Sequence, residues 1–163
     1  MIEIYDDFFS EEIQEEIFDK LMRPNWGISG GTDTKPEIFW HYDDLDKEEY
    51  FSEYLYEKIC AKLGRSFSSI KRIYANGQTA GQCGTLHKDD GDLTFLYYPC
   101  LEWDPHWQGH LIFVNDDGEE GRIIMYKSNR AILFDSKMCH YADAPYRFFN
   151  GLRISLAYKL RIK

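Results

Sequence analysis

The segment GTLHKDDGDLTFLYYP, residues 84–99, contains residue types that bind transition metals. One residue separates His87 from Asp89, and an apolar, aromatic run follows them. In an extended segment, residues i and i+2 face the same side, so one imidazole and one carboxylate would converge on one point. Two polar residues at the start of a strand would look the same, so the spacing alone does not establish a metal site.

A third ligand must come from a distant part of the chain. His140 lies 51 residues after Asp89, just past the strand-like run AILFD. Two imidazoles and one carboxylate on one face of an ion leave its other positions open, as in non-haem Fe(II) sites. A second His-x-Asp pair, His41–Asp43, falls in an expected loop, and the next histidine after it is His87 itself. We therefore favour His87 and Asp89 as the metal-binding pair.

An arginine near the C-terminus adds an anion-binding group. In LRISLAYKL, residues 152–160, strand alternation places apolar residues on one face and Arg153, Ser155 and Ala157 on the other. A buried arginine needs a partner, and its planar fork fits a carboxylate of a ligand. Ser155 is a candidate hydroxyl donor to that carboxylate. Tyr98, at the end of the run LTFLYYP, is another.

The pattern around these residues predicts helices first and strands later. Residues 2–9 are typical of a short strand and turn, and Ser10 is a candidate cap for a helix over 11–22. Residues 24–46 are expected to form a long loop, and a second helix should end near Gly64. Strands are then expected at 70–76, 93–99, 110–115, 122–126, 131–135 and 152–162.

This order of elements predicts an α+β fold that is mainly β. We expect one domain over residues 1–163, with a helical N-terminal part over about 1–66. The strands over about 67–163 are expected to close into a jelly-roll, the cupin-like double-stranded β-helix, with the helices packed on one sheet.

Composition limits the partners and the location. The chain has 163 residues, 44% of them hydrophobic, with a net charge of −9 and a pI near 5.0. Nucleic acid is therefore not an expected partner, because phosphate binding needs a basic face. Without a signal peptide, a run of ~18 apolar residues or a C-x-x-C pair, we expect a cytoplasmic protein with reduced thiols and no membrane partner. A compact single-domain protein of this kind would suit a bacterium or a virus-infected cell, as a monomer or homodimer.

The motifs HKD, CHY and LRIS, in this order, resemble the signature of the Fe(II)/2-oxoglutarate dioxygenases, in particular the prolyl 4-hydroxylase-like branch. The resemblance covers most of the chain. It includes the segments IYDDFFSEEIQEEI, YANGQTAGQCGTLHKDDGDLTFLYYP, WDPHWQGHLIFVND and NRAILFDSKMCHYADAP.

The resemblance implies roles for particular residues. His87, Asp89 and His140 would bind the iron. Arg153 would bind the distal carboxylate of 2-oxoglutarate, with help from Tyr98 and Ser155, and Tyr74 would lie near the other end of this co-substrate. The implied reaction uses O₂ and couples decarboxylation of 2-oxoglutarate to succinate with hydroxylation of a C–H bond. Ascorbate would be the reductant.

The substrate is the most open part of this interpretation. The resemblance implies a protein or peptide side chain, with proline as the first hypothesis. A free amino acid or small metabolite is an alternative, and a non-catalytic jelly-roll binding domain is an alternative from another class. The segment 24–46 is a candidate lid with Trp26, Trp40 and His41 as substrate contacts, although these aromatic residues would equally suit packing on the barrel.

Overall fold

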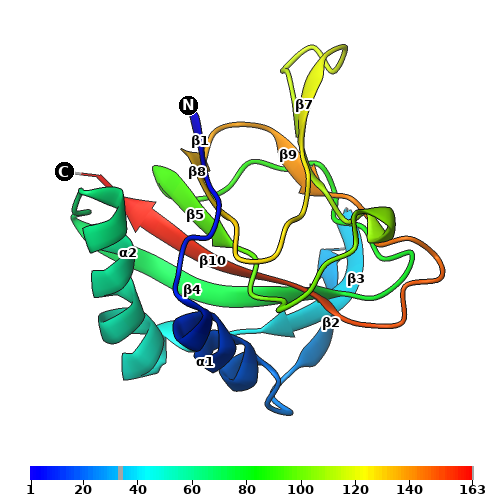
Figure 1. Cartoon of the computed structure of the whole chain (residues 1–163). Helices are drawn as coiled ribbons and strands as arrows, with labels where there is room; N and C mark the ends of the chain where they lie inside the picture. Colours follow the sequence, from blue (N-terminus) through cyan, green and yellow to red (C-terminus); the bar gives the residue numbers. More distant parts are fainter. Residues whose placement is uncertain (33–34, 163) are drawn as a thin grey trace.

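The fold is built on two antiparallel β-sheets, and the computed structural model describes residues 1–32 and 35–162. The larger sheet has seven strands in the order β1-β8-β5-β10-β4-β3-β2, and the smaller has the order β7-β6-β9. Phe113 of the smaller sheet packs edge-on against Phe134 of the larger, so the two sheets face one another (Figure 1). The strands are β1 Ile2–Tyr5, β2 Gly27–Thr32, β3 Lys35–Tyr42, β4 Ser69–Gln78, β5 Leu93–Tyr97, β6 Leu111–Val114, β7 Gly121–Ile124, β8 Ala131–Asp135, β9 His140–Ala142 and β10 Arg153–Arg161.

The helices cover the outer face of the seven-stranded sheet, away from the smaller sheet (Figure 1). They are α1 Glu11–Leu21, a π-helical turn Tyr50–Leu55 and α2 Tyr56–Leu63, with short 3₁₀ turns at Leu45–Lys47 and Pro105–Trp107. Tyr158, an outward-facing residue of β10, donates a hydrogen bond of 2.9 Å to the carbonyl oxygen of Phe51. This contact ties the central strand of the sheet to the helical layer.

The helices follow from apolar spacing in the sequence. Phe51, Leu55, Ile59 and Leu63 recur at every fourth position, and all four are buried. Gly64 then ends α2 in the left-handed region, with φ of 62°, as the sequence predicts. No helix within residues 1–32 and 35–162 is long and apolar enough to cross a membrane.

The predicted fold class is confirmed, because the chain is mainly β and forms the two sheets of a jelly-roll. All six strands expected after residue 68 are present, and NDDGEEG connects β6 to β7 as a hairpin. The expected loop over 24–46 is wrong. Residues Gly27–Thr32 and Lys35–Tyr42 are paired strands, and β3 pairs with β4.

The N-terminal 66 residues are therefore not purely helical. They supply three strands of the larger sheet, since β1 also pairs with β8. The sequence GISGGT hid its strand, because glycine and serine lack the branched side chains that mark strands in a sequence. The strand β9 was also missed, because its three residues are too few to show alternation.

An ion pair connects the end of β1 to the start of β8. Asp6 accepts hydrogen bonds from Arg130 at 2.7 and 3.1 Å and from Lys127 at 3.1 Å. The hydrogen bonds from Arg130 are the main reason why the pKa of Asp6 falls to about 2. A carboxylate whose pKa is lowered in the folded state stabilises that state above its unfolded pKa of about 4.

We predict that Asp6→Asn lowers the free energy of unfolding by at most about 1 kcal/mol at pH 7, because the pair is partly exposed. The difference from wild type should shrink as the pH falls from about 4 to about 2, where Asp6 takes up its proton. Urea unfolding at several pH values measures this. Asp7→Asn is the control, because Asp7 is exposed and its φ of 49° is one that asparagine adopts readily. A difference that does not change with pH would contradict the assignment.

Candidate active site

A backbone bridge brings the two motif histidines together. The amide of His87 donates to the carbonyl of His140 at 3.0 Å, and the amide of His140 donates to the carbonyl of His87 at 2.9 Å. This bridge is isolated, so His87 and Asp89 do not belong to a strand as the sequence suggested. They lie in the segment before β5, and the bridge to β9 fixes their position instead.

Each imidazole ring is oriented by a carbonyl oxygen of its own chain segment. Nδ1 of His87 lies 2.7 Å from the carbonyl oxygen of Thr85, and Nδ1 of His140 lies 2.8 Å from that of Met138. A carbonyl oxygen only accepts, so Nδ1 carries a proton in both rings, and in the neutral form of each ring Nε2 is left with a lone pair. Such carbonyl partners are typical of histidines that bind metals.

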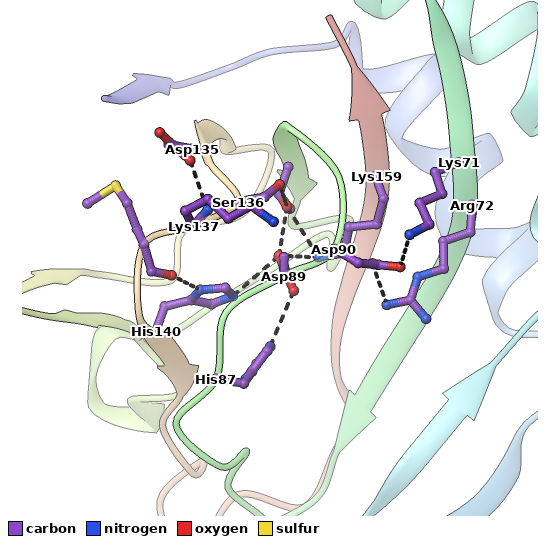
Figure 2. Close-up of polar contacts among 12 residues, drawn as sticks. Lys71, Arg72, His87, Asp89, Asp90, Asp135, Ser136, Lys137, His140 and Lys159 are labelled. Atoms are coloured by element: carbon purple, nitrogen blue, oxygen red, sulfur yellow. Dashed lines mark hydrogen bonds and ion pairs between the residues drawn. The ribbon is translucent and has the colours of Figure 1, made fainter. Parts of the chain in front are cut away.

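The two Nε2 atoms face the carboxylate of Asp89 (Figure 2). His87 Nε2 lies 3.4 Å from Oδ1, and His140 Nε2 lies 3.5 Å from Oδ2. Ligand atoms of all three residues lie within 4.8 Å of one another. The structure therefore brings together His87, Asp89 and His140, and this donor set of two neutral imidazoles and one carboxylate fits Fe(II).

The carboxylate of Asp89 is buried and heavily hydrogen-bonded. Its Oδ2 accepts from the hydroxyl of Thr94 at 2.7 Å and contacts the ammonium of Lys159, while its backbone amide donates to Ser136. Burial alone would raise the pKa of Asp89, but a hydrogen bond from protonated His87 and the charge of Lys159 hold it below its usual range. Asp89 is therefore ionised, as a metal ligand must be.

The two histidines differ in their electrostatics. In its protonated form, His87 donates from Nε2 to Asp89, and this hydrogen bond raises the pKa of His87. Burial lowers the pKa of His140, although the charge of Asp89 opposes this effect. The more exposed ring thus retains its proton more readily than the buried ring.

Arg153 is a second buried charged residue, and it lines the same cavity as Asp89. It is 1% exposed, and its guanidinium donates to the carbonyl oxygen of Gly109 at 2.6 Å and to Oε1 of Gln78 at 2.8 Å. Both acceptors are neutral, and no carboxylate pairs with it among the residues that the structure describes. A buried cation without an anionic partner fits a site that takes up a carboxylate from a ligand.

Tyr98 lies beside this guanidinium. Its ring centroid is 5.4 Å from the Arg153 guanidinium carbon, and its buried hydroxyl has no hydrogen-bond partner within the described part of the chain. Burial raises the pKa of Tyr98, and the charge of Arg153 opposes the rise. A buried hydroxyl left without a partner is the second feature that fits a ligand carboxylate here.

The other two predicted co-substrate residues, Tyr74 and Ser155, line the cavity at the triad. Tyr74 and Ser155, together with Asn76, line both the small inner cavity at the triad and the outer cavity of about 480 Å³ that opens from it. The side-chain oxygen of Asn76 is also buried without a partner in the described structure. Leu96, Leu111 and Phe134 give the inner cavity an apolar wall.

Only one of the three predicted substrate residues lies at this cavity. His41 lines it, and so does Phe39, which lies two residues earlier in β3 and therefore on the same face of the strand. Trp40 pairs with Gly77 and points to the opposite face of the sheet by the same alternation. Trp26 packs on Tyr42 and donates to the carbonyl of Leu21 at the end of α1. These two tryptophans therefore lie on the outer, helical side of the sheet, which agrees with the alternative that they pack on the barrel.

Three polar residues of the site were missed in the sequence. Thr94 and Lys159 contact Asp89, and Gln78 contacts Arg153. A signal for Lys159 was present, because it continues the row of alternate residues that begins at Arg153. Gln78 pairs in register with Arg153, which only the topology reveals.

Comparisons with solved structures support the fold. No family model matches the sequence, and a search of curated proteins found no match. The structure is similar to a prolyl hydroxylase from Trichoplax adhaerens in complex with a hypoxia inducible factor peptide (TM-score 0.74, 13% identity, 98% of this chain and 82% of that chain). It is also similar to a viral collagen prolyl hydroxylase from Paramecium Bursaria Chlorella virus-1 in a 2-oxoglutarate complex (TM-score 0.72, 13% identity, 99% of this chain and 96% of that chain). A third similar structure is HygX from Streptomyces hygroscopicus with nickel, 2-oxoglutarate and hygromycin B (TM-score 0.69, 13% identity, 97% of this chain and 82% of that chain).

The chain thus has the fold of the 2-oxoglutarate–Fe(II) oxygenases, prolyl hydroxylases among them. The resemblance noted in the sequence is confirmed at the level of the fold. At these identities the likeness establishes architecture, and the chemistry must be argued from the residues.

The unpartnered hydroxyl of Tyr98 leads to a testable difference between two stacked tyrosines. Tyr98 and Tyr126 have ring centroids 4.0 Å apart, and within the described residues only the hydroxyl of Tyr126 has a hydrogen-bond partner, the carbonyl oxygen of Ile154 at 2.7 Å. In ligand-free protein we predict that Tyr98→Phe leaves the free energy of unfolding unchanged or raises it by up to about 1 kcal/mol. Tyr126→Phe should lower it by about 1–2 kcal/mol, because it leaves that buried carbonyl unpaired. Chemical unfolding measures both, and an equal loss in the two variants would show that the Tyr98 hydroxyl has a partner.

Proposed function

We propose that this protein is an Fe(II)- and 2-oxoglutarate-dependent dioxygenase. It would convert 2-oxoglutarate, O₂ and a substrate C–H bond into succinate, CO₂ and a C–OH group, with one oxygen atom in each of succinate and the alcohol. Iron held by the triad would supply the activation of dioxygen. The observation that carries this proposal is the buried Arg153, which lacks a carboxylate partner in the described structure and lines the same inner cavity as the triad.

The residues of the chain would each perform a physical task. His87, Asp89 and His140 would hold the metal from one side and leave its other side to the cavity. Arg153 and Tyr98 would hold the distal carboxylate of the co-substrate, with Ser155 and Tyr74 along the path between. The apolar wall would exclude water from the metal. No side chain is needed as a nucleophile or general base.

The substrate that we propose is a side chain of a protein or peptide, with proline as the first candidate. The support is the shared fold with prolyl hydroxylases, and this part of the proposal is an analogy. The outer cavity of about 480 Å³, lined by Phe39, His41 and Asp43 of the β3 segment, leads from the surface to the triad. A small metabolite as substrate is the alternative, since HygX shares the fold. Ascorbate would keep the iron reduced, and we propose a cytoplasmic location.

Binding of the metal and of the co-substrate can be measured separately. Adding Fe(II) and then 2-oxoglutarate without oxygen should produce a charge-transfer absorption band in the visible range. Arg153→Met should weaken 2-oxoglutarate binding by about 100-fold while it retains metal binding, because it removes the bidentate partner of the carboxylate. His140→Ala should lose the band through loss of the metal.

Lys62→Met is a matched control, because Lys62 is an exposed residue of α2 and its loss changes the net charge equally. A folded wild-type protein that gives no band would overturn the oxygenase proposal and favour a non-catalytic binding domain.

The class of substrate can be tested by turnover. Succinate formation in air should increase several-fold with proline-containing peptides but not with free amino acids, and the peptide should gain the mass of one oxygen atom. Mass spectrometry of the peptide and assay of succinate measure the two products. Stimulation by free amino acids or other small molecules alone would overturn the peptide hypothesis and leave the oxygenase chemistry intact.

A further inference from the structure

Lys159 has an unusual position for a lysine. It is 2% exposed, lies near the end of β10, and its ammonium contacts Oδ2 of Asp89 and the hydroxyl of Thr94, the latter at 3.3 Å. Thr94 and Lys159 are register partners on neighbouring strands, so their side chains emerge side by side on the inner face. Figure 2 shows this ammonium directed at Asp89 together with the two histidines.

The two contacts to Oδ2 leave the carboxylate asymmetric. Oδ2 accepts from Thr94 and pairs with Lys159, and Nε2 of His140 lies 3.5 Å from it, whereas Oδ1 has a contact of 3.4 Å with Nε2 of His87. An oxygen that already has two donors is a poor metal ligand, because its lone pairs are engaged. Asp89 is therefore prepared to offer the metal one oxygen, Oδ1.

Lys159 also belongs to a row of residues that includes Arg153. Alternate residues of β10 share a face, so Arg153, Ser155, Ala157 and Lys159 all line the inner cavity. The two cations lie at the ends of this row, about 20 Å apart at Cα, a distance that their long side chains shorten. Between them stand two small side chains. The floor of the cavity thus suits a ligand with an anionic group at each end.

The charge balance of the inner cavity points the same way. Its described lining contains one carboxylate, Asp89, and two cations, Arg153 and Lys159. Because Lys159 already neutralises Asp89, a divalent metal would add two positive charges without a new anion to balance them. A dianion such as 2-oxoglutarate restores the balance better than a monoanion or a neutral molecule.

We propose that Lys159 is a second cationic positioning residue of the co-substrate site. It holds Oδ2 of Asp89 away from the metal and attracts the keto-acid end of the co-substrate, while Arg153 holds the distal end. This inference rests on the proposed function, and it assigns the metal-side end of the dianion to a residue that the sequence motif does not include.

The same positive charge must act in opposite directions on the two ligands. It repels a divalent cation and attracts a dianion. In Lys159→Met, we expect Co(II) to bind as tightly as in wild type or more tightly. The Co(II)-loaded variant should bind 2-oxoglutarate roughly tenfold more weakly or worse. A merely structural loss, which loosens the whole site, would weaken both ligands together.

Isothermal titration of Co(II), and then of 2-oxoglutarate into the Co(II)-loaded protein, measures both constants without turnover. Lys159→Gln is the second variant, because it removes the charge but retains a donor to Oδ2, so the site remains intact if Lys159→Met folds poorly. It should show the same two opposite shifts. Lys62→Met on α2 is the control for net charge and should leave both constants unchanged.

Two results would overturn the inference: 2-oxoglutarate affinity within twofold of wild type in both Lys159 variants, or a parallel loss of affinity for Co(II) and 2-oxoglutarate. The wild type separates this inference from the proposed function. If Co(II)-loaded wild type does not bind 2-oxoglutarate, the proposed function fails and the inference with it. If wild type binds and the Lys159 variants bind equally well, the proposed function stands and the inference alone fails.

Discussion

The pair of backbone hydrogen bonds between His87 and His140 is the interaction on which the site depends. It joins the segment before β5 to β9, and so it joins the larger sheet to the smaller one. Neither histidine lies in a long strand ladder, yet each ring is held by a carbonyl two residues before it. Backbone geometry alone thus directs both Nε2 atoms inward. Asp89 is positioned beside them by the hydrogen bond from its amide to the carbonyl oxygen of Ser136.

The two faces of β10 have different tasks, and both are buried. The outer face packs on the helices through residues such as Tyr158, and it contributes apolar burial to stability. The inner face presents Arg153 and Lys159, which are costly to bury because charged groups lose hydration. The apolar burial on the outer face therefore offsets part of the free energy that burying two cations on the inner face costs. The same division holds on β3, where Trp40 lies on the helical side and His41 on the cavity side.

Much of this arrangement could be predicted from the sequence, because alternation is a local signal. The strands after residue 68 and the shared face of Arg153 and Ser155 follow from period two. The triad was found from its residue types and their order, although His87 and Asp89 lie outside a strand. Pairing between distant strands is not local. The burial of Lys159 depends on Asp89 in another segment. The face of the sheet on which Trp40 lies depends on where β3 pairs with β4. A glycine-rich strand such as β2 carries no pattern of its own, so only its neighbour β3 defines it.

Under the proposed function, the hydroxyl of Tyr98, unpartnered within the described residues, and the guanidinium of Arg153, which pairs with no carboxylate there, have a consequence for the lifetime of the protein. A chain with polar groups that are satisfied only by a ligand is less stable without that ligand, and each bound molecule shifts the folding equilibrium in proportion to its concentration. The amount of folded protein in a cell would then follow the supply of the metabolite and the metal. Quality-control proteases would remove the empty form first, and abundance itself would report on metabolic state.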